Sequence, residues 1–186
     1  NYNGGWEKLF ENRLEVLKGF RRFLLVTDGD TSILEGLKGK VKVLVQRCLW
    51  HIPYQAKYVL WQDGVKHKSA EWLQVMSELM EICAIRPLVD CEKTIKKMIE
   101  SKRKRLESVI QYCLSKGYPH TASYLENAMP DMFTAIEKRL KGKTTSKVER
   151  VMRTINMRVN VSKWSIAGAL NVTKIRLAYY YNGFDA

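Results

Sequence analysis

The chain of 186 residues is long enough for one sizeable hydrophobic core, or for one domain that carries an insertion. It has 32 basic and 19 acidic residues, and its net charge of +13 favours an anionic partner, of which nucleic acid is the commonest. No apolar run reaches the length of a membrane-spanning helix, so we expect no membrane partner.

The first quarter of the chain predicts a β-α-β unit behind an N-terminal helix. Apolar residues at helical spacing predict a helix over 5–19, and apolar runs predict strands over 23–27 and 41–47. A short helix over 31–38 connects the strands, which predicts a parallel pair with a right-handed crossover. Both strands have the continuous apolar character of strands covered on both faces, and two strands alone do not make a stable sheet. We therefore expect partner strands upstream of the chain's first residue, Asn1.

From Cys48 onward the hydrophobic periodicity is helical. The predicted helices cover 49–61, 69–85, 90–115, 120–128 and 131–140, with one more from Ser146 and a last one over 165–181. The chain therefore reads as α/β and mostly helical, with an all-α lobe over 67–141 that separates the strands from the C-terminal helices.

Asp28 directly follows the first strand, in the segment FLLVTDGD at 23–30, and this position has two interpretations. In the first, Asp-Gly is a turn signal, and Asp30 or Thr31 caps the helix that follows. In the second, Asp28 is catalytic, because a carboxylate at the carboxyl end of a buried strand lies where parallel sheets place metal and phosphate chemistry. The short stretch alone leaves both interpretations open.

Glu149 and the pair Cys48 and His51 are the other candidates for chemistry. Ser146 and Glu149 fit a capping box, but Glu149 could equally face Asp28 and share a divalent metal with it, since hard cations prefer carboxylate oxygens. Cys48 and His51 stand three positions apart and supply two of the four ligands that zinc needs, whereas a buried Cys and a hydrogen-bonded His are the simpler interpretation. The four cysteines do not form a compact secreted framework, which favours a reducing cytoplasm.

The order of these motifs resembles that of the Mutator-like transposases and their bacterial insertion-sequence relatives. That family has a strand ending in S/T-D-G, then Q-R-C-x-x-H, then T-T-N-x-x-E-R. The corresponding segments here are VTDG at 26–29, QRCLWH at 46–51 and TTSKVER at 144–150. The segment KWS at 163–165, followed by an apolar helix, also resembles the family's C-terminal end. Ser146 stands where the family has Asn, and the usual Arg-Asn after the His is not evident.

The resemblance implies an RNase H-like core with a D-D-E carboxylate triad and bound Mg²⁺ or Mn²⁺. Asp28 matches the second Asp and Glu149 the Glu, and both would be catalytic metal ligands, while the Cys48–His51 motif would be structural or DNA-related. Residues 1–27 contain no Asp, so the first catalytic Asp is expected upstream, and the chain is expected to be inactive alone. The core would comprise 1–66 and 142–186, and 67–141 would be the helical insertion.

The resemblance also implies phosphodiester cleavage and strand transfer on DNA, by a homo-oligomer in the cytoplasm of a prokaryotic cell, at the nucleoid. Clustered basic residues are expected to contact DNA phosphates: Arg47, Lys96, Lys97, Lys102, Arg103, Lys104, Arg105, Lys143, Lys147, Arg150 and Arg153. One alternative is a non-catalytic, basic, helical nucleic-acid-binding domain. Another is a partner-binding helical protein whose Met-rich face at 76–80 fills a groove, although that face fits a core as well.

Overall fold

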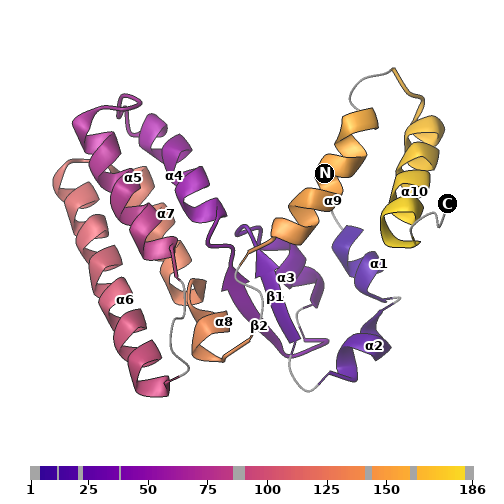
Figure 1. Cartoon of the computed structure of the whole chain (residues 1–186), viewed down its shortest axis with the longest axis horizontal. Helices are drawn as coiled ribbons and strands as arrows, with labels where there is room; N and C mark the ends of the chain where they lie inside the picture. The colour runs from indigo at the N-terminus through magenta and orange to yellow at the C-terminus, as the bar shows by residue number, and fades with distance from the viewer. Residues whose placement is uncertain are drawn as a thin grey trace. The chain divides into compact units, whose positions relative to one another are not determined.

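The computed structural model describes residues 5–11, 13–20, 23–37, 39–85, 91–140, 144–159 and 163–182. The described part is mostly helical and contains one small parallel sheet, as the sequence predicts (Figure 1). The chain divides into two compact units, Asn1–Thr144 and Thr145–Ala186. The division into a catalytic core and an insertion over 67–141 stays a prediction.

Strands β1 (Phe23–Thr27) and β2 (Val43–Arg47) pair in parallel, and helix α3 (Ser32–Leu37) connects them. Phe23 lies opposite Val43 and Thr27 lies opposite Arg47, so the carboxyl ends of both strands reach the same edge of the sheet. The predicted β-α-β unit is confirmed.

The strands are less covered than their apolar sequences predict. Most of their side chains are only half-buried, and the fully buried members are Thr27 and Gln46. Near β2 lie η1 (Met129–Asp131) and α8 (Thr134–Glu137), two short segments from much later in the chain. Contacts distant in sequence therefore decide which strand residues are buried.

The N-terminal segment forms two short helices where one was predicted. Helix α1 (Gly5–Glu11) packs against α3, and α2 (Leu14–Lys18) follows after a break. Arg13 leaves the helical conformation, with φ −126° and ψ −1°, and its amide N–H donates to the Phe10 carbonyl oxygen at 2.8 Å. This hydrogen bond between residues three positions apart is of the 3₁₀ type, which tightens the turn and ends α1.

The hydrophobic core lies among four longer helices: α4 (His51–Gln62), α5 (Ala70–Cys83), α6 (Glu92–Ser115) and α7 (Pro119–Ala128). Helix α4 packs against α5 and α7, and α6 packs against α5 and α7 (Figure 1). Leu60, Leu79, Leu106 and Leu125 contribute one fully buried side chain from each of these helices. Burial of such side chains is the main stabilising contribution to this body.

Side-chain caps fix the ends of several of these helices. The Ser69 hydroxyl accepts a hydrogen bond from the Trp72 amide at 3.2 Å and begins α5. The Asp63 carboxylate, just after α4, accepts the amides of His120 at 3.0 Å and Thr121 at 2.8 Å at the start of α7. Asp63 therefore joins the end of one helix to the beginning of another.

The helix predicted over 131–140 is shorter than expected. The 3₁₀ segment η1 precedes α8, and Arg139, with φ 53°, ends α8 in the left-handed conformation. The amides of Leu140 and Arg139 donate to the carbonyl oxygens of Ala135 at 2.6 Å and Ile136 at 3.1 Å. This pair of hydrogen bonds is a Schellman motif, which stops the helix.

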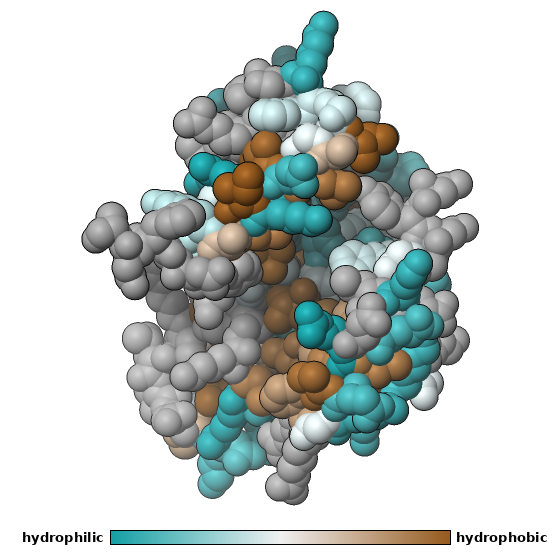
Figure 2. All heavy atoms as spheres, turned by 90° about the vertical axis from the view of Figure 1, so that its right-hand side faces the viewer, coloured by the Kyte–Doolittle hydropathy of each residue, from teal (hydrophilic) through white to brown (hydrophobic). Residues whose placement is uncertain are grey.

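The second unit consists of α9 (Ser146–Val159) and α10 (Ile166–Asn182), which pack against each other. The Arg176 guanidinium joins them by donating to the Thr154 carbonyl oxygen at 3.1 and 3.3 Å. Helix α10 exposes several apolar side chains, and Ile166 is 84% exposed. Figure 2 shows that hydrophobic side chains reach the surface of the chain among hydrophilic ones. Among the described residues, no helix is both long and apolar enough to cross a membrane.

Candidate functional site

Asp28 lies at the carboxyl end of β1 with its side chain exposed. Its Oδ1 accepts weak hydrogen bonds from the Asp30 amide at 3.3 Å and the Thr27 hydroxyl at 3.5 Å. Its Oδ2 accepts no hydrogen bond from any residue that the structure describes. The carboxylate therefore keeps most of its lone-pair capacity for a ligand from outside this turn.

Arg47 contacts the backbone of the turn that carries Asp28. Its guanidinium donates to the Asp28 carbonyl oxygen at 3.5 Å and to the Asn127 carbonyl oxygen, at the end of α7, at 3.2 Å. Gly29 has φ 117°, a conformation that favours glycine, and a Cβ there would lie 1.5 Å from Arg47 Nη1. The backbone conformation thus favours glycine, and a larger residue would also displace the Arg47 guanidinium.

The two acids of the Asp-Gly-Asp turn have separate roles. Asp30 Oδ1 accepts the Ser32 amide at 2.9 Å, and hydrogen bonds from the Ser32 side chain and amide lower the pKa of the Asp30 carboxyl. The Thr31 carbonyl oxygen accepts the Glu35 amide at 3.1 Å, which makes Thr31 the N-cap of α3. The capping role predicted for this turn is therefore carried by Asp30 and Thr31, and Asp28 takes no part in it.

Two further ionisable groups lie near Arg47. Asp131 of η1 is half-buried, and this burial raises the pKa of its carboxyl, while the charge of Arg47 partly opposes the shift. Burial raises the pKa of Tyr124 of α7 to about 12, again opposed by Arg47. The Tyr124 hydroxyl is buried and has no hydrogen-bond partner among the described residues. The helical body thus brings an acid and a phenol toward the sheet edge that carries Asp28.

Cys48 and His51 do not form a metal site with other described residues. Cys48 is fully buried, and its amide continues the parallel ladder by donating to the Thr27 carbonyl oxygen at 2.7 Å. The His51 ring lies edge-on to Trp50, with ring centroids 4.9 Å apart. No three His, Cys, Asp or Glu side chains of the described residues are grouped so that they could hold a metal ion. The contacts seen here are those of a buried thiol and a ring that packs.

Glu149 lies in the first turn of α9 and is exposed. Its amide donates to the Thr145 carbonyl oxygen at 3.0 Å, so Thr145 is the N-cap of α9. The acid of a capping box stands three positions after the N-cap, whereas Glu149 stands four positions after it. Asp28 and Glu149 belong to different compact units. Their predicted approach to about 4–8 Å, the range expected for carboxylates that share metal ions, stays a prediction.

The basic residues of α6 divide into two groups. Lys102, Arg103 and Arg105 contact other helices, through the Glu81 carbonyl oxygen, the Glu137 carboxylate at 2.7 Å and the Glu78 carboxylate at 2.7 Å, respectively. Lys96 pairs with Glu92 at 3.1 Å on the surface of α6, and Lys97 and Lys104 are exposed.

The residues predicted to bind DNA therefore differ in whether their side chains are exposed. Lys97 and Lys104 are seven positions apart and lie on one face of α6, and Arg150 and Arg153 are exposed on α9. The predicted contact Lys143, and the side chain of Lys147, lie outside the described part of the chain. The exposed residues are the ones that can reach phosphates without giving up an internal contact.

No protein-family model, curated protein or solved structure matches this chain. The resemblance to the Mutator-like and insertion-sequence transposases therefore rests on the order of its motifs.

Proposed function

We propose that this chain is part of the catalytic domain of a DDE transposase of the Mutator-like and bacterial insertion-sequence type. The observation that carries the proposal is the position of Asp28, at the carboxyl edge of a parallel β-α-β unit, in a turn whose backbone Arg47 contacts. Open α/β sheets bind their ligands at this edge. In this proposal β1, α3 and β2 belong to an RNase H-like core.

The two acids have distinct positions in the proposed site. Asp28 offers a carboxylate at the sheet edge, one oxygen of which accepts no hydrogen bond from the described residues, and Glu149 offers an exposed carboxylate in the first turn of α9. Oxygen donors of this kind suit Mg²⁺ or Mn²⁺. When bound, such ions activate water for attack on a phosphodiester and stabilise the leaving oxygen.

The described residues supply no third carboxylate grouped with these two. A site that fixes two ions at a phosphodiester needs several charged ligands to hold them in place. We therefore propose that the chain alone does not cut or join DNA, although it contributes to binding metal and DNA. Lys97, Lys104, Arg150 and Arg153 would neutralise phosphates.

A non-catalytic DNA-binding domain is the second candidate function. It is favoured by the net charge of +13 and by the lack of a three-residue metal group among the described residues. In that case Asp28 would be part of a turn and would hold no ion.

Calorimetric titration with Mn²⁺ distinguishes the two functions. Asp28→Asn and Glu149→Gln should each weaken Mn²⁺ binding by about tenfold or more. Asp30 lies two positions from Asp28 and caps α3, so the control variant Asp30→Asn should leave Mn²⁺ binding unchanged. The double variant should bind little more weakly than either single variant, because removal of one ligand already disables a shared site. Equal effects of Asp28→Asn and Asp30→Asn would contradict the transposase proposal.

A further inference from the structure

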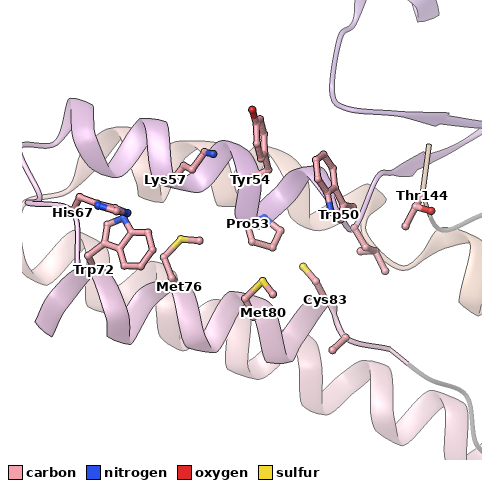
Figure 3. A pocket seen from close by; sticks show the side chains of 12 residues that line it. Trp50, Pro53, Tyr54, Lys57, His67, Trp72, Met76, Met80, Cys83 and Thr144 are labelled. Carbon is pink, nitrogen blue, oxygen red and sulfur yellow. The ribbon is translucent and has the colours of Figure 1, made fainter. Parts of the chain in front are cut away.

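An open, mostly apolar groove lies between α4 and α5, with a volume of about 490 Å³. Trp50, Tyr54 and Lys57 line it from α4, and Trp72, Met76 and Met80 line it from α5, as Figure 3 shows. The volume lies within the range typical of pockets for small ligands. None of the described residues that line the groove is acidic.

Two stacked aromatic rings, those of Trp50 and Tyr54, form part of the α4 wall of the groove. The Trp50 and Tyr54 ring centroids are 5.1 Å apart and the rings are inclined by only 16°. The Tyr58 ring, which does not line the groove, lies edge-on to Tyr54 with centroids 5.6 Å apart. These side chains are four positions apart, so they lie on one face of α4. Trp50 remains 55% exposed, which leaves aromatic surface available to a flat ligand.

One positive charge, that of Lys57, lies beside these rings. The Lys57 ammonium lies 3.7 Å from the centroid of the Tyr54 ring and 4.9 Å from that of Tyr58. His67, whose ring packs edge-on against Trp72 with centroids 4.8 Å apart, lies at the opposite end of the groove from Trp50 (Figure 3). A ligand that matches these features has flat apolar groups linked by negative charges.

We propose that the groove binds unpaired bases of single-stranded DNA, which stack on Trp50 and Tyr54 while a neighbouring phosphate contacts Lys57. Aromatic side chains combined with a positively charged groove are how proteins bind single strands without sequence preference. Every base has a flat face, whereas an apolar peptide helix would have no negative charge to place at Lys57. The inference rests on the proposed function, in which DNA is the partner, and it assigns a separate site for the unpaired strand.

The test measures the affinity of the full chain for a fluorescein-labelled ten-residue oligothymidylate by anisotropy. Trp50→Ala should weaken binding by about tenfold, because stacking of one base contributes about 1–3 kcal/mol. Trp50→Phe should restore most of the affinity, and Trp61→Ala should have no effect, since Trp61 is 75% exposed on the same helix and does not line the groove. Thermal melting of each variant checks that it is folded.

An abasic oligomer of the same length is the matched probe, because it keeps the phosphates and lacks the bases. It should bind the native chain about tenfold more weakly than oligothymidylate, and Trp50→Ala should not weaken it further. Equal binding of both probes, an equal effect of Trp61→Ala, or unchanged binding with Trp50→Ala would overturn the inference.

Duplex DNA separates this inference from the proposed function. Trp50→Ala should leave duplex binding and Mn²⁺ binding unchanged. Mn²⁺ binding that depends on Asp28, together with no preference for unpaired bases, would reject the groove and keep the transposase proposal. A Trp50-dependent preference for unpaired bases, without Mn²⁺ binding at Asp28, would keep the groove and reject the transposase.

Discussion

The side-chain amide of Gln46 in β2 donates a hydrogen bond to the Met132 carbonyl oxygen at 2.6 Å, across 86 positions of sequence. The same amide group donates to the Arg47 carbonyl oxygen at 2.6 Å, and its oxygen accepts the Ala135 amide at 2.8 Å. Gln46 is fully buried. A buried polar side chain is therefore fully hydrogen-bonded, and it joins the sheet to the segment between η1 and α8.

Replacing Gln46 with Leu should destabilise the chain by about 3 kcal/mol, because two buried backbone groups and one part-buried backbone group would lose their partner. Urea unfolding should show a lower midpoint with an unchanged slope. Gln55→Leu, a change of the same type at an exposed position of α4, should shift stability by no more than about 0.5 kcal/mol. Equal effects of the two changes would contradict the role assigned to Gln46.

Replacing Gly29 with Ala should destabilise the Asp28 turn by about 2 kcal/mol, because φ 117° is strained for alanine and the added Cβ meets the Arg47 guanidinium. In an Arg47→Ala background the same change should cost about 1 kcal/mol less, since the steric part of the penalty is removed. Thermal unfolding of the four chains measures this coupling. Additive effects of the two substitutions on stability would show that a side chain at position 29 does not clash with Arg47.

The sequence predicts local features of this fold well and non-local ones poorly. Hydrophobic periodicity is enough to predict the strands and most helices, because each pattern depends on near neighbours. The break at Arg13 and the Schellman stop at Arg139 have no glycine or proline to signal them. At the candidate site, Asp28 is recognisable from its place after a strand.

The interactions around the site depend on segments far apart in the chain. The links from Gln46 to Met132 and from Arg47 to Asn127 join strand β2 to segments more than 75 positions later. The partners of Lys102, Arg103 and Arg105 likewise lie on other segments, so a basic run alone could not separate them from Lys97 and Lys104. The aromatic row at Trp50, Tyr54 and Tyr58 has a helical spacing that could have indicated it from sequence.

Cys91 should be the most reactive of the four cysteines. It is exposed, and the neighbouring Thr94 amide and side chain lower the pKa of its thiol. Burial raises the pKa of Cys83 to about 12 and that of Cys113 to about 11, so both thiols stay protonated from pH 7 to 9. Mass spectrometry after brief iodoacetamide treatment at pH 8 should find the label at Cys91 in the folded chain. Labelling of Cys83 or Cys113 at the same rate would contradict this account.

Duplex DNA binding should depend steeply on salt through the exposed lysines of α6. Replacing both Lys97 and Lys104 with Ala should reduce the slope of log K against log salt by about 0.9 for each phosphate that is no longer neutralised. Lys116→Ala, which removes an exposed charge at the C-terminal end of α6, should not change the slope. Anisotropy titrations at four salt concentrations give the slopes. An unchanged slope in the double variant would show that these lysines of α6 do not contact DNA phosphates.

Asp28 and Glu149, which belong to different compact units, share a divalent ion in the proposed function. The most direct measurement of this claim is the ¹⁵N spectrum of the full chain during titration with Mn²⁺, whose unpaired electrons broaden the signals of nearby amides. We expect the amides of 28–30 and 148–150 to broaden at the same Mn²⁺ concentration, and Asp28→Asn to abolish both effects together. Broadening around Asp28 that leaves Glu149 and its neighbours unchanged, or broadening at 148–150 that persists in Asp28→Asn, would contradict the claim.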